Sequence, residues 1–154
     1  MVKSFLYLIV ITFFILFLFS ISAPLNTENI KYVNFENTQV KVDLALTPSE
    51  HAKGLSGRQS LMEGEGLLFV FDKPGKYSFW MQDMNFPIDI IWLSSFQEKG
   101  QRGFKIVHIK KDASPASYPD TYTSSENAEY VLEVVAGFSE KNNLKVGDRV
   151  EFEY

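Results

Sequence analysis

The sequence predicts a mainly β domain, a compact antiparallel barrel or sandwich that carries two short helices and is therefore α+β by content. Three observations lead to this fold class. The apolar segments are short, and polar stretches rich in Gly, Pro, Asp and Ser separate them. Neither a strand–helix–strand rhythm nor an internal repeat runs through the chain. The 154 residues include no cysteine, so a hydrophobic core and not disulfides must hold the domain together.

The N-terminal segment Met1–Ala23 predicts either a secretory signal peptide or an uncleaved membrane anchor. Lys3 is a short basic region, and Phe5–Phe19 follows it without one charged residue. Small residues then allow cleavage after Ser22. Residues 4–23 are also near the roughly 20 apolar residues that a membrane-spanning helix needs. Both alternatives export the rest of the chain to the periplasm, the medium or the outer face of the cytoplasmic membrane, with membrane contact only through residues 4–23.

The exported part divides into residues 24–37, a linker with a first short strand at Ile30–Phe35, and residues 38–154, a single mainly β domain. Thr38–Leu46 alternates between apolar and polar residues, which indicates a half-buried strand. Its expected buried face consists of Val40, Val42, Leu44 and Leu46.

A two-turn helix is predicted directly after this strand. Thr47 can cap its N-terminus, Pro48 suits the first helical position, and Glu50 completes a capping box. Gly54 is a suitable C-terminal cap.

The remaining elements follow the apolar clusters. Strands are expected at Leu67–Phe71, Tyr77–Gln82, Ile88–Leu93, Phe104–Lys110 and Tyr130–Ala136. Loops or turns are expected at Gly57–Gly66, Asp72–Gly75 and Ser94–Gly103, a helical turn within Gly137–Asn143, and a closing hairpin over Leu144–Tyr154. Lys111–Glu129 lacks periodicity and is long for a loop, so it is either a flexible lid or a surface insertion.

Composition excludes several functional classes. The net charge of −4 argues against nucleic acid as a partner. The absence of cysteine excludes a cysteine zinc site, a thiol nucleophile and a lipid-modified cysteine. Phosphate-loop, dinucleotide and serine-hydrolase motifs are absent. His51 is expected to face solvent, and His108 is expected to lie on an edge strand. These two histidines are far apart in the sequence, so neither a metal nor a cofactor is predicted.

Two carboxylates lie within strands that are apolar on both faces. Asp89 interrupts Pro87–Leu93, and Glu133 interrupts Tyr130–Val135. Such strands are usually buried, and a buried carboxylate must be paired, hydrogen-bonded or protonated. Candidate cationic partners are Arg58 and His108. Three interpretations stay open: acid–base catalysis, a purely structural role, or the lining of a binding pocket.

The segment Phe79–Pro87 contains the most unusual local sequence. Phe79 is expected in the core, while Trp80 and Met81 must point to opposite faces of their strand. An indole beside Asn85 and Asp89 would form a platform for a sugar or a peptide. The candidate ligand-binding residues are Arg58, Trp80, Met81, Asn85, Asp89, Tyr122 and Glu133, whereas no catalytic residue is identified.

Several blocks in order resemble a known family. They are Val42–Ala45, Thr47–Glu50, Gly54–Arg58, Gly66–Phe71, Phe79–Met81, Pro87–Ile90, Tyr130–Glu133, Gly137 and Val146–Val150. The resemblance covers roughly Val40–Phe152 and is to domain of unknown function 192, a family often found on exported prokaryotic proteins. It implies a compact mainly β fold and no settled reaction.

Three functions are compatible with these residues. The first is a small-molecule, glycan or peptide binding module of the cell envelope, with Lys111–Glu129 as a cover over its pocket. The second is a non-catalytic structural envelope protein. The third is a hydrolase of envelope polymers that uses Asp89 and Glu133, provided that both carboxylates reach one open cleft. Whether the protein is an enzyme stays open, and the residues favour a non-catalytic role.

Overall fold

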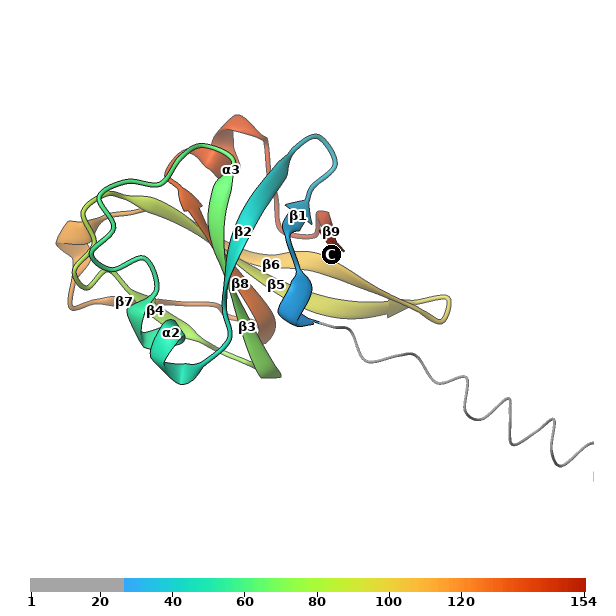
Figure 1. Ribbon diagram of the computed structural model, residues 1–154. Helices are drawn as coiled ribbons and strands as arrows, with labels where there is room; N and C mark the ends of the chain where they lie inside the picture. The colour runs from blue at the N-terminus through green and yellow to red at the C-terminus, as the bar shows by residue number, and fades with distance from the viewer. Residues whose placement is uncertain (1–26) are drawn as a thin grey trace, which may run out of the picture.

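A computed structural model describes residues 27–154, in which seven strands close into a barrel and two further strands form a small separate sheet (Figure 1). The order around the barrel is β1-β2-β3-β8-β5-β6-β9, and β4 pairs with β7. The strands are β1 (Tyr32–Asn34), β2 (Gln39–Ala45), β3 (Glu65–Gly75), β4 (Ser78–Trp80), β5 (Ile88–Glu98), β6 (Gln101–Ala113), β7 (Thr121–Thr123), β8 (Ala128–Val135) and β9 (Arg149–Glu153). The helices are α2 (Pro48–Lys53) and α3 (Phe138–Lys141), with 3₁₀ turns η1 (Thr27–Asn29) and η2 (Pro115–Ser117). The mainly β prediction with two short helices is confirmed.

The predicted signal peptide or anchor, Met1–Ala23, lies outside the described residues. Within residues 27–154, no helix has the length and apolar character needed to span a bilayer.

One pair of strands departs from the antiparallel expectation. β2 and β3 run parallel, with Ala45 opposite Phe69, whereas every other pair in the barrel is antiparallel. A parallel pair needs a crossover, and α2 lies in the connection between the two strands. The sequence shows this crossover only as an isolated short helix, which is why the parallel pairing could not be inferred from it.

The central strands are buried on both faces because the domain has two cores. We call the first the inner core. It draws residues from all seven barrel strands: Val33, Val40, Val42, Leu68, Ile91, Leu93, Phe104, Ile106, Tyr130, Leu132, Val134 and Val150, with others from the loops and α3. The outer core lies on the other face of β3, β5 and β8, beneath β4, β7 and the segment that follows α2: Ala45, Leu55, Leu67, Phe69, Phe79, Met81, Ile88, Ile90, Trp92, Val107, Ala113, Ala128 and Val131.

The helix α2 has the predicted caps. The Thr47 hydroxyl accepts from the Glu50 N–H at 3.2 Å, and the Glu50 carboxylate accepts from the Thr47 N–H at 2.8 Å. Gly54 ends the helix with φ of +50°. The alternation predicted for the preceding strand holds at Val40, Val42 and the partly buried Leu44, which pack in the inner core, and fails only at Leu46. Ala45 is buried in the outer core and Leu46 is exposed, because β2 enters the second layer at its C-terminal end.

Four predicted loops or hairpins are corrected. Asp72–Gly75 is a bulged continuation of β3, where the pairing with β8 is irregular between Val70 and Gly75. The turn predicted over Ser94–Gly103 is confined to Lys99 and Gly100, because β5 and β6 continue through the rest of this range as a hairpin. Backbone pairing does not require apolar side chains, so the strand ends predicted from hydropathy fall short of the observed ends.

The closing hairpin and the long loop are the other two corrections. Leu144–Tyr154 contains only β9, which pairs with β1 and β6 and closes the barrel. Lys111–Glu129 contains β7, which pairs with β4 and places Tyr122 opposite Phe79. The long segment is therefore a layer over the outer core, not a structureless loop.

Candidate functional site

The register of β5 and β8 places the two buried carboxylates on opposite faces of the sheet. Asp89 lies opposite Val134, and Glu133 lies opposite Ile90. Cross-strand partners share a face and successive residues alternate, so Asp89 faces the inner core and Glu133 faces the outer core. Sequence reasoning identifies both as buried but cannot assign their faces without the register.

Asp89 is fully buried and satisfied by backbone donors. Its Oδ1 accepts from the Asp112 N–H at 2.9 Å and the Gly137 N–H at 3.3 Å, and its Oδ2 accepts from the Ser139 N–H at 2.8 Å. These bonds join the end of β6 to the start of α3. Asp112 has a positive φ of 50°, so the carboxylate also holds an uncommon backbone conformation. The Asp89 carboxylate is therefore a structural link.

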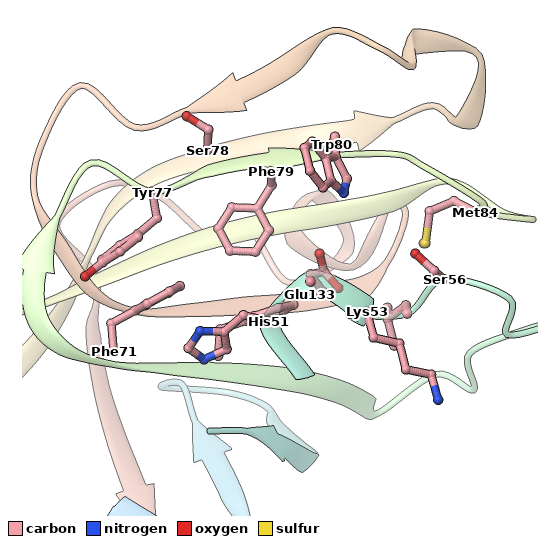
Figure 2. Close-up of a pocket in the computed structure, with 14 residues that line it drawn as sticks. His51, Lys53, Ser56, Phe71, Tyr77, Ser78, Phe79, Trp80, Met84 and Glu133 are labelled. Atoms are coloured by element: carbon pink, nitrogen blue, oxygen red, sulfur yellow. The ribbon is translucent and has the colours of Figure 1, made fainter. Parts of the chain in front are cut away.

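Glu133 lies in a pocket of about 140 Å³ between the barrel, α2 and β4 (Figure 2). Figure 2 shows its carboxyl group near the centre, with Phe79 and Trp80 on one side and α2 on the other. The lining residues are His51, Ala52, Lys53, Gly54, Leu55, Ser56, Phe69, Phe71, Tyr77, Ser78, Phe79, Trp80, Met84 and Glu133. One carboxyl group thus lies in a pocket to which five of the lining residues contribute aromatic side chains.

The aromatic wall is a continuous series of ring contacts. Phe79 meets Phe69 edge to face, with centroids 4.9 Å apart and planes at 86°. His51 packs against Phe71 at 4.6 Å, and Phe71 stacks on Tyr77 at 3.5 Å. These contacts fix the rings in place before any ligand enters.

The sequence predicted that His51 faces solvent, and this prediction is wrong. Its ring is half-buried, and Nε2 donates to the Ala45 carbonyl at 2.9 Å. The contact with Phe71 explains the difference, because it turns the ring over the outer core instead of away from α2.

The Glu133 carboxyl group has no adequate partner. Its residue is 5% exposed, and Oε2 is buried without a hydrogen bond to any described residue. Burial raises the pKa of Glu133 to about 8, and the positive charge of Arg58 offsets part of that rise. At neutral pH the proton is mostly retained, so the group can donate a hydrogen bond or release its proton when a cation approaches.

Gly54 opens the pocket next to this carboxyl group. A Cβ on this residue would lie 3.3 Å from Phe69 Cζ and 3.8 Å from Glu133 Oε2. The glycine thus serves both the helix end, which needs the positive φ, and the space at the base of the pocket.

The other predicted site residues are dispersed around this pocket. Trp80 lines it and is 50% exposed, whereas Met81 is 1% exposed in the outer core. Arg58 pairs with Asp43 at 2.9 Å on the surface. Its carbonyl accepts from Asn85 Nδ2 at 2.8 Å, which ties two loops together.

Tyr122 lies outside the pocket lining. Its half-buried ring packs on the outer core and carries Lys110 Nζ 4.8 Å from its centroid. The structure therefore brings Trp80 and Glu133 together and places the remaining predicted residues in supporting contacts or in the core.

Sequence reasoning missed most of the lining. His51, Phe71, Tyr77 and Met84 carry no motif, and only the fold assembles them. One signal was available: Leu67, Phe69 and Phe71 alternate along β3, and Leu67 lies opposite Glu133. That alternation places the two Phe rings on the face of the carboxylate.

A metal ion has no ready set of ligands in residues 27–154. No group of three or more His, Asp or Glu side chains comes close enough there to hold one.

Comparison with known proteins places the chain in a family. Residues 31–152 match the family DUF192, described as an uncharacterized ACR. A crystal structure from Novosphingobium aromaticivorans, described as a protein of unknown function, is 27% identical with a TM-score of 0.70, over 84% of this chain and 89% of that one. A crystal structure of a "putative transcription regulator" from Sinorhizobium meliloti is 28% identical with a TM-score of 0.68, over 79% and 90% of the two chains.

Comparison with curated proteins gave no match. The match to DUF192 extends from β1 into β9 and so includes every strand of the barrel and every residue that lines the Glu133 pocket. The chain therefore belongs to the DUF192 family.

Proposed function

We propose that the protein is an extracytoplasmic binding module whose ligand inserts a small group into the Glu133 pocket. The ligand is a small molecule, or the exposed end of a glycan or peptide. The observation that carries the proposal is the buried Glu133 Oε2, which has no partner among the described residues and faces an aromatic-walled pocket.

A buried polar atom without a partner costs free energy of folding, so folded proteins retain few of them. Asp89 shows that this fold can satisfy a buried carboxylate with three backbone N–H groups. Glu133 lacks such donors, and its raised pKa is typical of groups in binding or catalytic clefts. A ligand donor at Oε2 would supply the missing hydrogen bond.

The pocket holds one carboxyl group, which favours binding over hydrolysis. A hydrolase of the predicted type needs two carboxylates in one cleft. Asp89 projects to the opposite face of the sheet and is occupied by backbone donors. The pocket therefore lacks the pair of carboxylates that such a hydrolase requires.

The proposed location rests on Met1–Ala23 and its charge-free apolar run. Cell fractionation followed by protease treatment of intact spheroplasts tests it. Cleavage of the chain in spheroplasts supports export, and protection until lysis refutes it.

Thermal unfolding of the full-length chain in detergent tests the binding function. The panel contains sugars, muropeptides, peptides and small organic ions. A ligand at 100 times its Kd should add about 2.7 kcal/mol to the free energy of unfolding. A shift that Trp80→Ala abolishes and the exposed control Glu151→Gln retains supports the pocket. A panel without any shift contradicts the proposal.

A further inference from the structure

We propose that the Glu133 pocket binds an organic ammonium group, which enters head-first and places its positive charge between Glu133 Oε2 and the aromatic rings. This inference rests on the proposed binding function and names the chemical class of the ligand.

The Glu133 carboxyl group lacks a partner that an ammonium group would supply. Its Oε2 has no hydrogen bond from any described residue. Once Glu133 has released its proton, its carboxylate would repel an anionic group, and a purely apolar group would leave Oε2 unpaired in either protonation state. An ammonium group supplies a positive charge and, in a primary amine, N–H donors as well. It therefore completes the site in a way that neither alternative does.

The aromatic side chains that line the Glu133 pocket also favour a cation. Ring faces carry partial negative charge, and aromatic cages around a cation are a general means of ammonium recognition. Phe79 and Trp80 flank the carboxyl group in Figure 2. Phe69 is held against Phe79 in an edge-to-face contact, which leaves the wall rigid. A carboxylate surrounded by rings combines both attractive forces for a cation.

The size of the Glu133 pocket also limits what can enter it. The pocket measures about 140 Å³, below the roughly 300–1,000 Å³ of sites that enclose a whole drug-sized ligand. Only a head group can enter, so the rest of the ligand must lie outside. Trp80 is 50% exposed at this pocket and offers an indole surface to that outer part.

The charged and titratable groups of the neighbouring elements do not fill the site. The Lys53 ammonium points away from Glu133 in Figure 2, and the Arg58 guanidinium is paired with Asp43. The His51 Nε2 is taken up by the Ala45 carbonyl, to which it donates at 2.9 Å. The Tyr77 hydroxyl donates to the Lys73 carbonyl. None of these groups neutralises Glu133 Oε2 directly.

The experiment compares matched probes by isothermal titration of the full-length chain in detergent at pH 8.5, where Glu133 is mostly ionised because its pKa is about 8. The probes are choline, n-butylammonium and the neutral choline isostere 3,3-dimethylbutan-1-ol. We expect at least one ammonium probe to bind about tenfold or more tightly than the neutral isostere. Tighter choline binding identifies a quaternary head group, and tighter n-butylammonium binding identifies a primary amine.

Three variants locate the effect. Glu133→Gln should reduce the preference for the cation to the part that the aromatic rings supply, and preserve weak binding of the neutral isostere. Trp80→Ala, at an exposed position, should keep the fold and weaken ammonium binding more than isostere binding. The control Glu151→Gln should change neither affinity.

The two proposals fail in different ways. Equal affinity for ammonium and isostere, or a cation preference that is undiminished in Glu133→Gln, overturns the ammonium inference and leaves the binding module in place. If no probe binds and no member of the wider panel shifts thermal unfolding, the binding function itself is refuted.

Discussion

Replacement of Asp89 by asparagine should destabilise the domain strongly without touching the Glu133 pocket. The change keeps the shape of the side chain and replaces one carboxylate oxygen with an NH₂ group. In its better orientation the amide oxygen still accepts from Asp112 and Gly137. The NH₂ group then meets the Ser139 N–H, so two donors face each other where a 2.8 Å hydrogen bond had been.

The magnitude follows from the bonds involved. A hydrogen bond to a charged group contributes about 1.5–3 kcal/mol, and a buried donor left unpaired costs a further 1–3 kcal/mol. We expect Asp89→Asn to lower the free energy of unfolding by about 3 kcal/mol. For a domain of this size that loss corresponds to a fall in Tm of roughly 10 °C.

Thermal and urea unfolding measure this loss, and amide hydrogen exchange locates it. Exchange at Ser139 and Asp112 should rise more than at the centre of β8. The matched control is Asp43→Asn, which removes the exposed ion pair with Arg58. Exposed pairs contribute about 0–1 kcal/mol, so the control should unfold near the wild type.

The structural role of Asp89 would be refuted by a loss below about 1 kcal/mol, or by equal losses in Asp89→Asn and Asp43→Asn. Either result would mean that the three backbone bonds do not hold α3 to the barrel.

Three further predictions concern the pocket and the outer core beside it. Glu133 has a pKa near 4.5 in the unfolded chain and about 8 in the folded one, so its contribution to stability is lost as pH rises from 4.5 to 8, by up to about 1.4 kcal/mol per pH unit. Urea unfolding across this range should show a free energy of unfolding that depends less on pH in Glu133→Gln than in the wild type. The same pH dependence in both proteins would contradict the raised pKa of Glu133. Gly54→Ala should lower the free energy of unfolding by about 1–2 kcal/mol, which is more than Gly57→Ala should lower it. Both glycines have positive φ, but only at Gly54 would a Cβ meet neighbouring atoms. Equal losses in the two variants would show that this contact is unimportant. Met81→Ala should lower the free energy of unfolding by about 2–5 kcal/mol and Trp80→Ala by less than about 1 kcal/mol, since the Met81 side chain is 1% exposed and the Trp80 side chain 50%. A larger loss for Trp80→Ala than for Met81→Ala in chemical denaturation would contradict the faces assigned to them.

Local signals in the sequence were reliable where a short segment determines its own structure. The capping box at Thr47 and Glu50 needs only its own backbone, so α2 begins where it was predicted. Hydropathy failed for the hairpin of β5 and β6, because the polar residues near its tip are held by pairing with each other. It failed again for Asp72–Gly75, where turn-forming residues lie within a bulged strand that β8 supports.

Three features can be read from the sequence: the domain is mainly β, Asp89 and Glu133 are buried, and Trp80 and Met81 point apart. These conclusions depend on composition and on alternation along single strands, which any segment carries within itself. The tertiary structure alone decided what each carboxylate does. The register of β5 against β8 sends Asp89 to three backbone donors and Glu133 to an aromatic pocket, and no pattern within either strand encodes that register.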